Sequence, residues 1–231
     1  MSIREHTSLP QHTTSTRPSR WALPITAGAG FLAGLDTTAV NLALPDIQRD
    51  LAAGLTALQW VVNAFALLSA ALLVTAGDLS DRFGRRRVFV SGLLSFGVAS
   101  AACGLSSSAL LLDLARAAQG AAAAVVTAGG LAVLASIYPP AERGRALGVS
   151  AAIAALSFVV GPLVGGTLTD VVGWRSVFLA NVPVAALIAL AARARLPELR
   201  SRSRDAGRPR FDHAGVATST LGFGALLYAA L

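Results

Sequence analysis

Residues 77–87 read GDLSDRFGRRR and separate two apolar stretches, LTALQWVVNAFALLSAALLVTA at 55–76 and VFVSGLLSFGVASAACGLS at 88–106. Each stretch supplies about the 20 mostly apolar residues that a helix needs to cross a bilayer. The charged segment between them is too polar to remain in the hydrocarbon core. This part of the sequence therefore predicts two transmembrane helices joined by a short basic loop.

The same pattern continues in both directions along the chain. Further apolar windows lie at roughly 23–44, 109–137, 146–169 and 174–192, and another begins near Gly215 and runs to Leu231. Hydrophobic residues make up 54% of the 231 residues and charged residues 13%. We therefore expect an all-α integral membrane protein: a six-helix bundle plus the start of a seventh helix. The expected helix ends are marked by Pro45, Gly84, Pro139-Pro140 and Gly173.

The arginines predict the orientation of this bundle. All 19 basic residues are arginine; sixteen fall on one side, in the amino-terminal segment and the connectors after the second, fourth and sixth windows. Only Arg49 and Arg175 fall on the other side, and Arg116 lies within a window. Because basic loops stay in the cytoplasm, we expect a multi-pass protein of the cell membrane with both ends cytoplasmic. The net charge of +7 then reflects orientation among membrane lipids, and no nucleic-acid partner is expected.

Four segments follow from these observations. We expect a disordered cytoplasmic tail at 1–20, the six-helix bundle at 21–192, a basic cytoplasmic linker at 193–214 and a truncated seventh helix at 215–231.

The charged segment carries a recognisable spacing. Its residues resemble the major facilitator signature G-x-L-x-D-R-x-G-R-[KR], and the positions that match are Gly77, Leu79, Asp81, Arg82, Gly84, Arg85 and Arg86. A glycine permits close helix approach or a tight turn, and an aspartate can pair with nearby arginines. We therefore expect Gly77, Asp81, Arg82, Gly84, Arg85 and Arg86 to form a conformational latch. The alternative is a basic topogenic loop with incidental acids.

Two charges lie deep within apolar windows. At 1.5 Å per residue, Asp36 lies about 12 Å and Arg116 about 10 Å from the outer ends of their helices, so both occupy one slab of the membrane. Charges at this depth need a partner or a cavity. Asp113, Arg116 and Gly120 share a helix face, with Gln119 about 60° away. The pair either exchanges partners when a proton arrives or is a fixed structural ion pair.

Three further motifs resemble one branch of the same superfamily. Residues 35–45, LDTTAVNLALP, look like the first-helix motif of the fourteen-span drug:proton antiporters, and residues 116–120, RAAQG, resemble the superfamily's R-x-x-Q-G. Residues 157–167 resemble the G-P-x-x-G-G antiporter motif through Gly161, Pro162, Gly165 and Gly166. Ser157, Gly161, Gly165 and Thr169 recur every four residues, which predicts a ridge for tight packing, and Pro162 predicts a bend. Gln59-Trp60, Trp174-Arg175 and Asn181-x-Pro183 also resemble this family, or serve as interfacial anchors and helix breakers.

The resemblance implies a function. It implies proton-coupled efflux of multiple drugs or other small, amphipathic or cationic molecules, with no enzyme activity, cofactor or metal. The residues expected to couple protons or bind substrate are Asp36, Asn41, Asp113, Arg116 and Gln119. A nutrient or metabolite symporter, a uniporter of the same fold and a nontransporting fragment are the alternatives. Because pockets in this fold lie between two halves, we expect this chain to need a carboxy-terminal half and not to transport alone.

Overall fold

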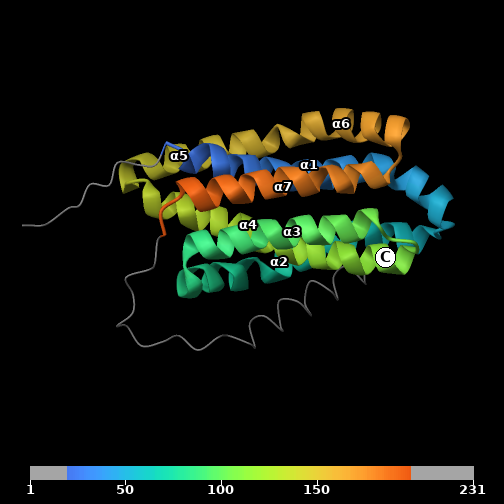
Figure 1. Cartoon of the computed structure of the whole chain (residues 1–231), viewed down its shortest axis with the longest axis horizontal. Helices are drawn as coiled ribbons and strands as arrows, with labels where there is room; N and C mark the ends of the chain where they lie inside the picture. Colours follow the sequence, from blue (N-terminus) through green and yellow to red (C-terminus); the bar gives the residue numbers. More distant parts are fainter. Residues whose placement is uncertain (1–19, 199–231) are drawn as a thin grey trace, which may run out of the picture.

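The computed structural model describes residues 20–198 as a bundle of helices that run along one common long axis (Figure 1). The elements are α1 (Ala22–Leu51), α2 (Leu55–Phe83), α3 (Arg85–Gly104), α4 (Ala109–Ile137), α5 (Pro140–Ala155), α6 (Ser157–Val172) and α7 (Arg175–Arg195). Because α5 and α6 follow each other in a single span, the described residues form six helices long and apolar enough to cross a membrane. The predicted six-helix membrane fold is confirmed. The tail at 1–19, the linker beyond Glu198 and the seventh helix lie outside the described residues.

The helices extend past the apolar windows from which they were predicted. At 1.5 Å per residue, α2 with its 29 residues is about 44 Å long, more than the hydrocarbon core of about 30 Å. Backbone hydrogen bonding continues through the headgroup region, where charged side chains are tolerated. Pro45 was wrongly expected to mark a helix end: it lies inside α1, which continues to Leu51. A proline removes only one backbone donor, and the rest of that turn stays helical.

The other residues that were predicted to mark helix ends do lie at helix ends. Gly84 and Gly173 adopt φ of 98° and 101°, values that side chains disfavour, and each separates two helices. Pro140 is the first residue of α5. The backbone N–H at this position has no acceptor within the helix, so a proline, which lacks that N–H, is well tolerated there. The bend in the fifth span was predicted at Pro162. The structure instead interrupts this span at Leu156, six residues earlier. There the Leu156 N–H is shared between the carbonyls of Ala152 and Ile153, at 3.2 Å each.

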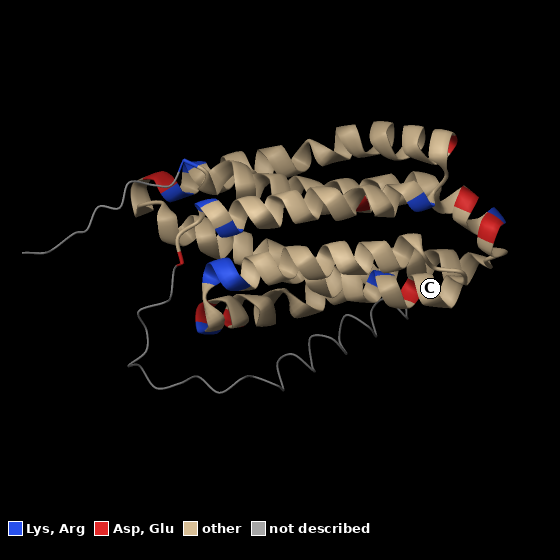
Figure 2. Ribbon diagram, in the orientation of Figure 1, with Lys and Arg blue, Asp and Glu red and all other residues tan. Residues whose placement is uncertain are grey.

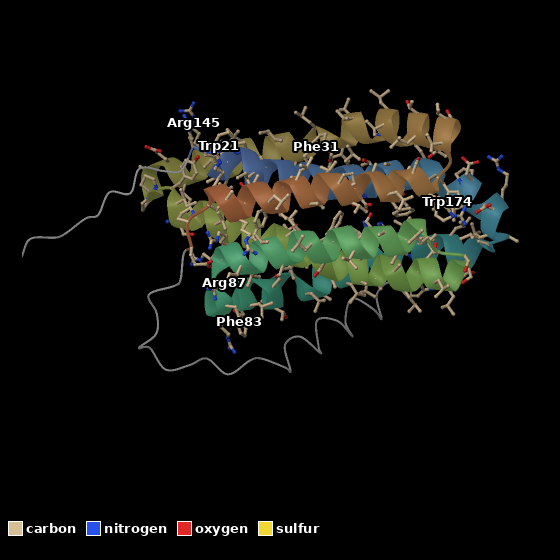
Figure 3. All side chains as sticks on the ribbon, viewed as in Figure 1. Trp21, Phe31, Phe83, Arg87, Arg145 and Trp174 are labelled. Atoms are coloured by element: carbon tan, nitrogen blue, oxygen red, sulfur yellow. The ribbon has the colours of Figure 1, made fainter. Side chains whose placement is uncertain are left out.

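The arginines collect at one end of the bundle (Figure 2). We call this the Gly84 end; it holds Arg20, Arg82, Arg85, Arg86, Arg87, Arg143, Arg145, Arg193 and Arg195. The opposite end, which we call the Asp50 end, holds Arg49 and Arg175 together with Asp46, Asp50 and Asp170. Figure 3 shows Trp21, Phe83, Arg87 and Arg145 toward the first end and Trp174 at the second.

Two apolar clusters fill the bundle along its length. One, toward the Gly84 end, includes Phe65, Phe89 and Phe96 and draws on α1, α2, α3, α4 and α7. The other, toward the Asp50 end, includes Ile47 and Phe178. Between them lie the buried polar side chains of Asp36, Ser100, Arg116, Gln119 and Asn181. The fold therefore encloses one polar layer between two apolar ones.

Candidate functional site

An ion pair joins α1 to α4 in the middle of the bundle. Arg116 Nη1 lies 2.6 Å from Asp36 Oδ2, and the two side chains are 1% and 0% exposed. Arg116 also donates from Nε to the carbonyl oxygen of Val61 at 2.9 Å and from Nη1 to Gln119 Oε1 at 2.8 Å. Its guanidinium lies 4.2 Å from the centre of the Phe65 ring. The equal depths estimated from the sequence therefore correspond to direct contact.

Three neutral side chains complete this polar network. Gln119 Nε2 donates to Asp36 Oδ1 at 2.9 Å, and Asn181 Nδ2 donates to the same oxygen at 2.6 Å. Both amides also donate to Ser100 Oγ, at 3.2 and 3.1 Å. Ser100 in turn donates to the carbonyl oxygen of Phe178 at 2.8 Å. Helices α1, α3, α4 and α7 are thus tied together by one hydrogen-bonded unit.

The network accounts for the burial of two charges. Removing an ion pair from water costs several kcal/mol per ion unless the remaining hydrogen-bonding positions are filled. Here both carboxylate oxygens of Asp36 accept hydrogen bonds, and two groups besides the carboxylate accept from Arg116. The protein itself therefore supplies further hydrogen-bond partners to both charged groups. Gln119 and Asn181 donate to the carboxylate, and Val61 and Gln119 accept from Arg116.

The structure brings together three of the five residues predicted for this site. Asn41 is exposed on α1, and Asp113 is only partly buried on α4, so neither joins the network. Asp113 Oδ1 is buried without a hydrogen-bond partner among the described residues. Asn41 follows Asp36 by five residues, which turns it about 140° away on α1. Asp113 lies about 60° from Arg116, on the side opposite to Gln119, so it falls at the edge of the face that carries the network.

Sequence reasoning missed Ser100 and noticed Asn181 only as part of a motif. Ser100 is one of several serines in the apolar window at 88–106, and the sequence gives no sign that this one contacts α7 and α4. The signal that could have found Asn181 is its depth, because an amide far inside a span needs hydrogen-bond partners there. The described residues contain no group of three or more metal-ligating side chains.

The predicted latch residues lie at the Gly84 end, where Arg85 and Arg86 contact different partners. Asp81 accepts from Arg85, with Nη2 to Oδ1 at 2.9 Å, and Arg85 also donates to the carbonyl oxygen of Ala132 on α4 at 3.2 Å. Gly84 provides the turn between α2 and α3. A Cβ on Gly77 would meet no atom within 4 Å, so close helix approach at this glycine is not seen in the described bundle.

Arg86 makes a different connection, to the end of α7. It donates to Glu198 Oε2 from Nε at 3.1 Å and to the carbonyl oxygen of Leu196 from Nη1 at 3.0 Å. Arg87 adds a second contact to Glu198 at 3.4 Å. The charged segment therefore contacts the residues that directly follow α7. Arg82 also has interactions at this end.

The small-residue ridge of α6 packs on α1. A Cβ added to Gly165 would lie 2.6 Å from Ala39 Cα, and one added to Gly161 would overlap the Thr38 side chain. Thr38 Oγ1 lies 3.1 Å from the carbonyl oxygen of Ser157. Gly166 faces a looser contact, 3.6 Å from Leu42 Cδ1. All four residues of the predicted ridge, Ser157, Gly161, Gly165 and Thr169, are buried, and Gly166 lies at its side.

The six spans of the described residues and the buried network define a helical multi-pass membrane protein, and comparison with known proteins identifies its family. The family model described as Major Facilitator Superfamily matches residues 26–230, and the chain belongs to that superfamily.

Several curated relatives are similar to the chain over most of its length. Multidrug resistance protein Stp of Mycobacterium tuberculosis is 41% identical over 210 residues, which cover 90% of this chain and 38% of that protein. Puromycin resistance protein pur8 of Streptomyces alboniger is 41% identical over 211 residues, 90% of this chain and 41% of that one. The chain thus spans about two fifths of the length of these relatives.

Solved structures support the same fold. A bacterial homologue of the human lysosomal transporter Spinster, in an inward-facing and unoccupied conformation, matches with a TM-score of 0.70 at 22% identity. The match covers 91% of this chain and 50% of that chain. The chain is therefore a multi-pass membrane protein with the fold of one half of such a transporter.

Proposed function

We propose that the whole protein exports small amphipathic or cationic molecules across the cell membrane in exchange for protons, as a fourteen-span drug:proton antiporter. The observation that carries this proposal is a wholly buried carboxylate, Asp36, paired with Arg116 in a chain whose relatives are named for drug resistance. A fixed buried ion pair is a weak source of stability, because desolvation offsets most of its attraction. Retention of these charges in the membrane is better explained by a change of charge during transport.

Asp36 is the proposed proton carrier, and Arg116 is the proposed partner that responds. When Asp36 is ionised, Arg116 Nη1 is held at its carboxylate. When a proton binds, the electrostatic attraction is lost, and Arg116 is retained by Val61, Gln119 and the Phe65 ring. The helices α1 and α4 would then be less firmly joined, which allows the bundle to change shape. Asp113 and Asn41, outside the network, are proposed to contact substrate or a second bundle.

The orientation follows from the same reasoning about arginines. We propose that the Gly84 end faces the cytoplasm, since nine of the described arginines lie there and two at the Asp50 end. The contacts of Asp81, Arg85 and Arg86 then form the proposed latch on the cytoplasmic side.

The test compares two aspartates of α1 in the full-length protein. Asp36→Asn keeps the size of the side chain and removes its charge and its ability to carry a proton. Asp46→Asn removes a charge that lies at the surface, 2.6 Å from Arg49. We expect Asp36→Asn to abolish ethidium efflux and drug-driven proton release, and Asp46→Asn to leave both close to normal. Normal coupled efflux by Asp36→Asn would show that Asp36 is not the coupling acid.

A second bundle is proposed to be necessary. The relatives are more than twice as long as this chain, and rocking transport moves one bundle against another. Cells that express only residues 1–231 should retain ethidium like cells that express the Asp36→Asn variant of that segment. Proton-dependent export by the segment above this control would favour a functional dimer instead.

A further inference from the structure

An apolar pocket lies beside the polar network, between α1, α6 and α7. Its volume is about 190 Å³, and its walls include Phe31 and Leu35 of α1, Val164 and Leu168 of α6, and Val184 of α7. Figure 3 shows Phe31 where α1 and α6 run next to each other. Every wall residue is apolar except one, Asn181. The pocket is thus a hydrocarbon-like space with a single polar group.

The polar atom that Asn181 offers to this space is its carbonyl oxygen. Both hydrogen bonds of its Nδ2 are committed, to Asp36 Oδ1 and to Ser100 Oγ, which fixes the amide orientation because a carboxylate oxygen only accepts. Among the described residues, Oδ1 accepts no hydrogen bond. Asn181 is only 2% exposed. Oδ1 is thus the one hydrogen-bonding position of the Asn181 side chain that the network does not use, and a ligand with a donor group can fill it.

The surroundings determine how a ligand would arrive. Val184 of α7, on the pocket wall, is 42% exposed. Nearby, Leu163 of α6 and Leu187 of α7 are 68% and 66% exposed. All lie within segments that cross the membrane. Apolar side chains at that depth meet lipid tails, so a molecule dissolved in the bilayer can reach the pocket without passing through water. A cavity of this size holds one aromatic ring or a short alkyl chain.

We propose that this pocket binds small membrane-soluble molecules that have an apolar body and one hydrogen-bond donor, a hydroxyl or an amine, directed at Asn181 Oδ1. The site lies within a single bundle and does not require a second one. Asn181 connects it directly to Asp36, because the amide that would accept from the ligand also donates to the carboxylate. A donor on Oδ1 polarises that amide and strengthens its N–H bonds. The pocket is therefore placed to influence the buried ion pair from the lipid side.

The site can be tested with photoreactive probes, independently of transport. The full chain in lipid nanodiscs would be irradiated with an octan-1-ol that carries a diazirine on its alkyl chain, and labelled peptides identified by mass spectrometry. We expect labels on pocket-wall residues such as Val164, Leu168 and Val184, and protection by excess octanol. The matched octane diazirine, without the hydroxyl, should label these positions roughly threefold to tenfold less, as expected for one neutral hydrogen bond. Equal labelling by both probes would show that only acyl chains fill the space and would overturn the proposal.

A pair of variants separates the pocket from general contact with lipid. Gly28→Leu places bulk in the pocket where there is room, since a Cβ there meets only Ile188 Cδ1 at 4.0 Å. It should abolish protectable labelling, whereas Leu187→Phe on the lipid-exposed face should leave it unchanged. Retention of octanol protection in Gly28→Leu would refute this location. If Gly28→Leu failed to fold, the comparison of the two probes on the unmodified chain would still decide the proposal. Efflux plays no part in either measurement, so failure of this site and failure of the proposed function are distinguishable.

Discussion

Gly165 of α6 gives the sharpest test of how the bundle is packed. A methyl group there would lie 2.6 Å from Ala39 Cα and 3.0 Å from the Ala39 carbonyl oxygen. Favourable carbon contacts need about 3.5 to 4.0 Å, so α1 and α6 would have to separate by roughly 1 Å at their closest point. Overpacking of this kind typically costs about 1–3 kcal/mol. The obstacle is backbone, which cannot rotate away as a long side chain can.

The neighbouring glycine provides the control. A methyl group on Gly166 would lie 3.6 Å from Leu42 Cδ1, an ordinary contact with a flexible side chain. Replacement of a helical glycine by alanine favours the helix by about 0.5–1 kcal/mol where there is room. The two alanine variants should therefore change stability in opposite directions.

The assay is thermal unfolding of the purified full-length protein in detergent. Loss of the native state is followed by its fluorescence as the temperature rises. We expect Gly165→Ala to unfold several degrees below the parent and Gly166→Ala at or slightly above it. Gly165→Leu, with more bulk on the ridge, should also abolish efflux while the protein still inserts in the membrane. If Gly165→Ala and Gly166→Ala were equally stable, the ridge would not pack on α1, and this packing argument would be wrong.

Three further predictions concern other parts of the bundle. Ser100→Ala leaves two buried amides without their shared acceptor, and it should destabilise the protein by about 1–3 kcal/mol, whereas Ser95→Ala on the exposed side of α3 should have little effect in the same unfolding assay. Glu198→Gln should increase protease cleavage just after α7, because Arg86 loses a charged partner; unchanged cleavage would show that the backbone contacts suffice. Cysteines that replace Arg143 should react with membrane-impermeant maleimide only after cells are opened, and labelling of intact cells would reverse the proposed topology.

Much of this architecture could be predicted from the sequence because the bilayer imposes a simple length rule. Six apolar windows of sufficient length predicted six spans, and the constant rise of a helix placed Asp36 and Arg116 at one depth. Glycines with positive φ at 84 and 173 ended helices where expected. The window edges were less accurate because helices continue beyond the hydrocarbon core, as α1 does past Pro45.

The arrangement of side chains around the buried pair depended on tertiary structure. Sequence spacing fixes the depth of a residue along its own helix, whereas the rotation of each helix is set by the packing of its neighbours. That rotation turns Ser100 and Asn181 into the network and leaves Asn41 exposed, although all three are polar side chains within spans. The pocket between α1, α6 and α7 exists because the ridge of α6 lies close on α1, while α7 is held to α3 and α1 by the polar network. The sequence by itself determined which residues share a depth in the membrane; only the packing of the helices decided which of them meet.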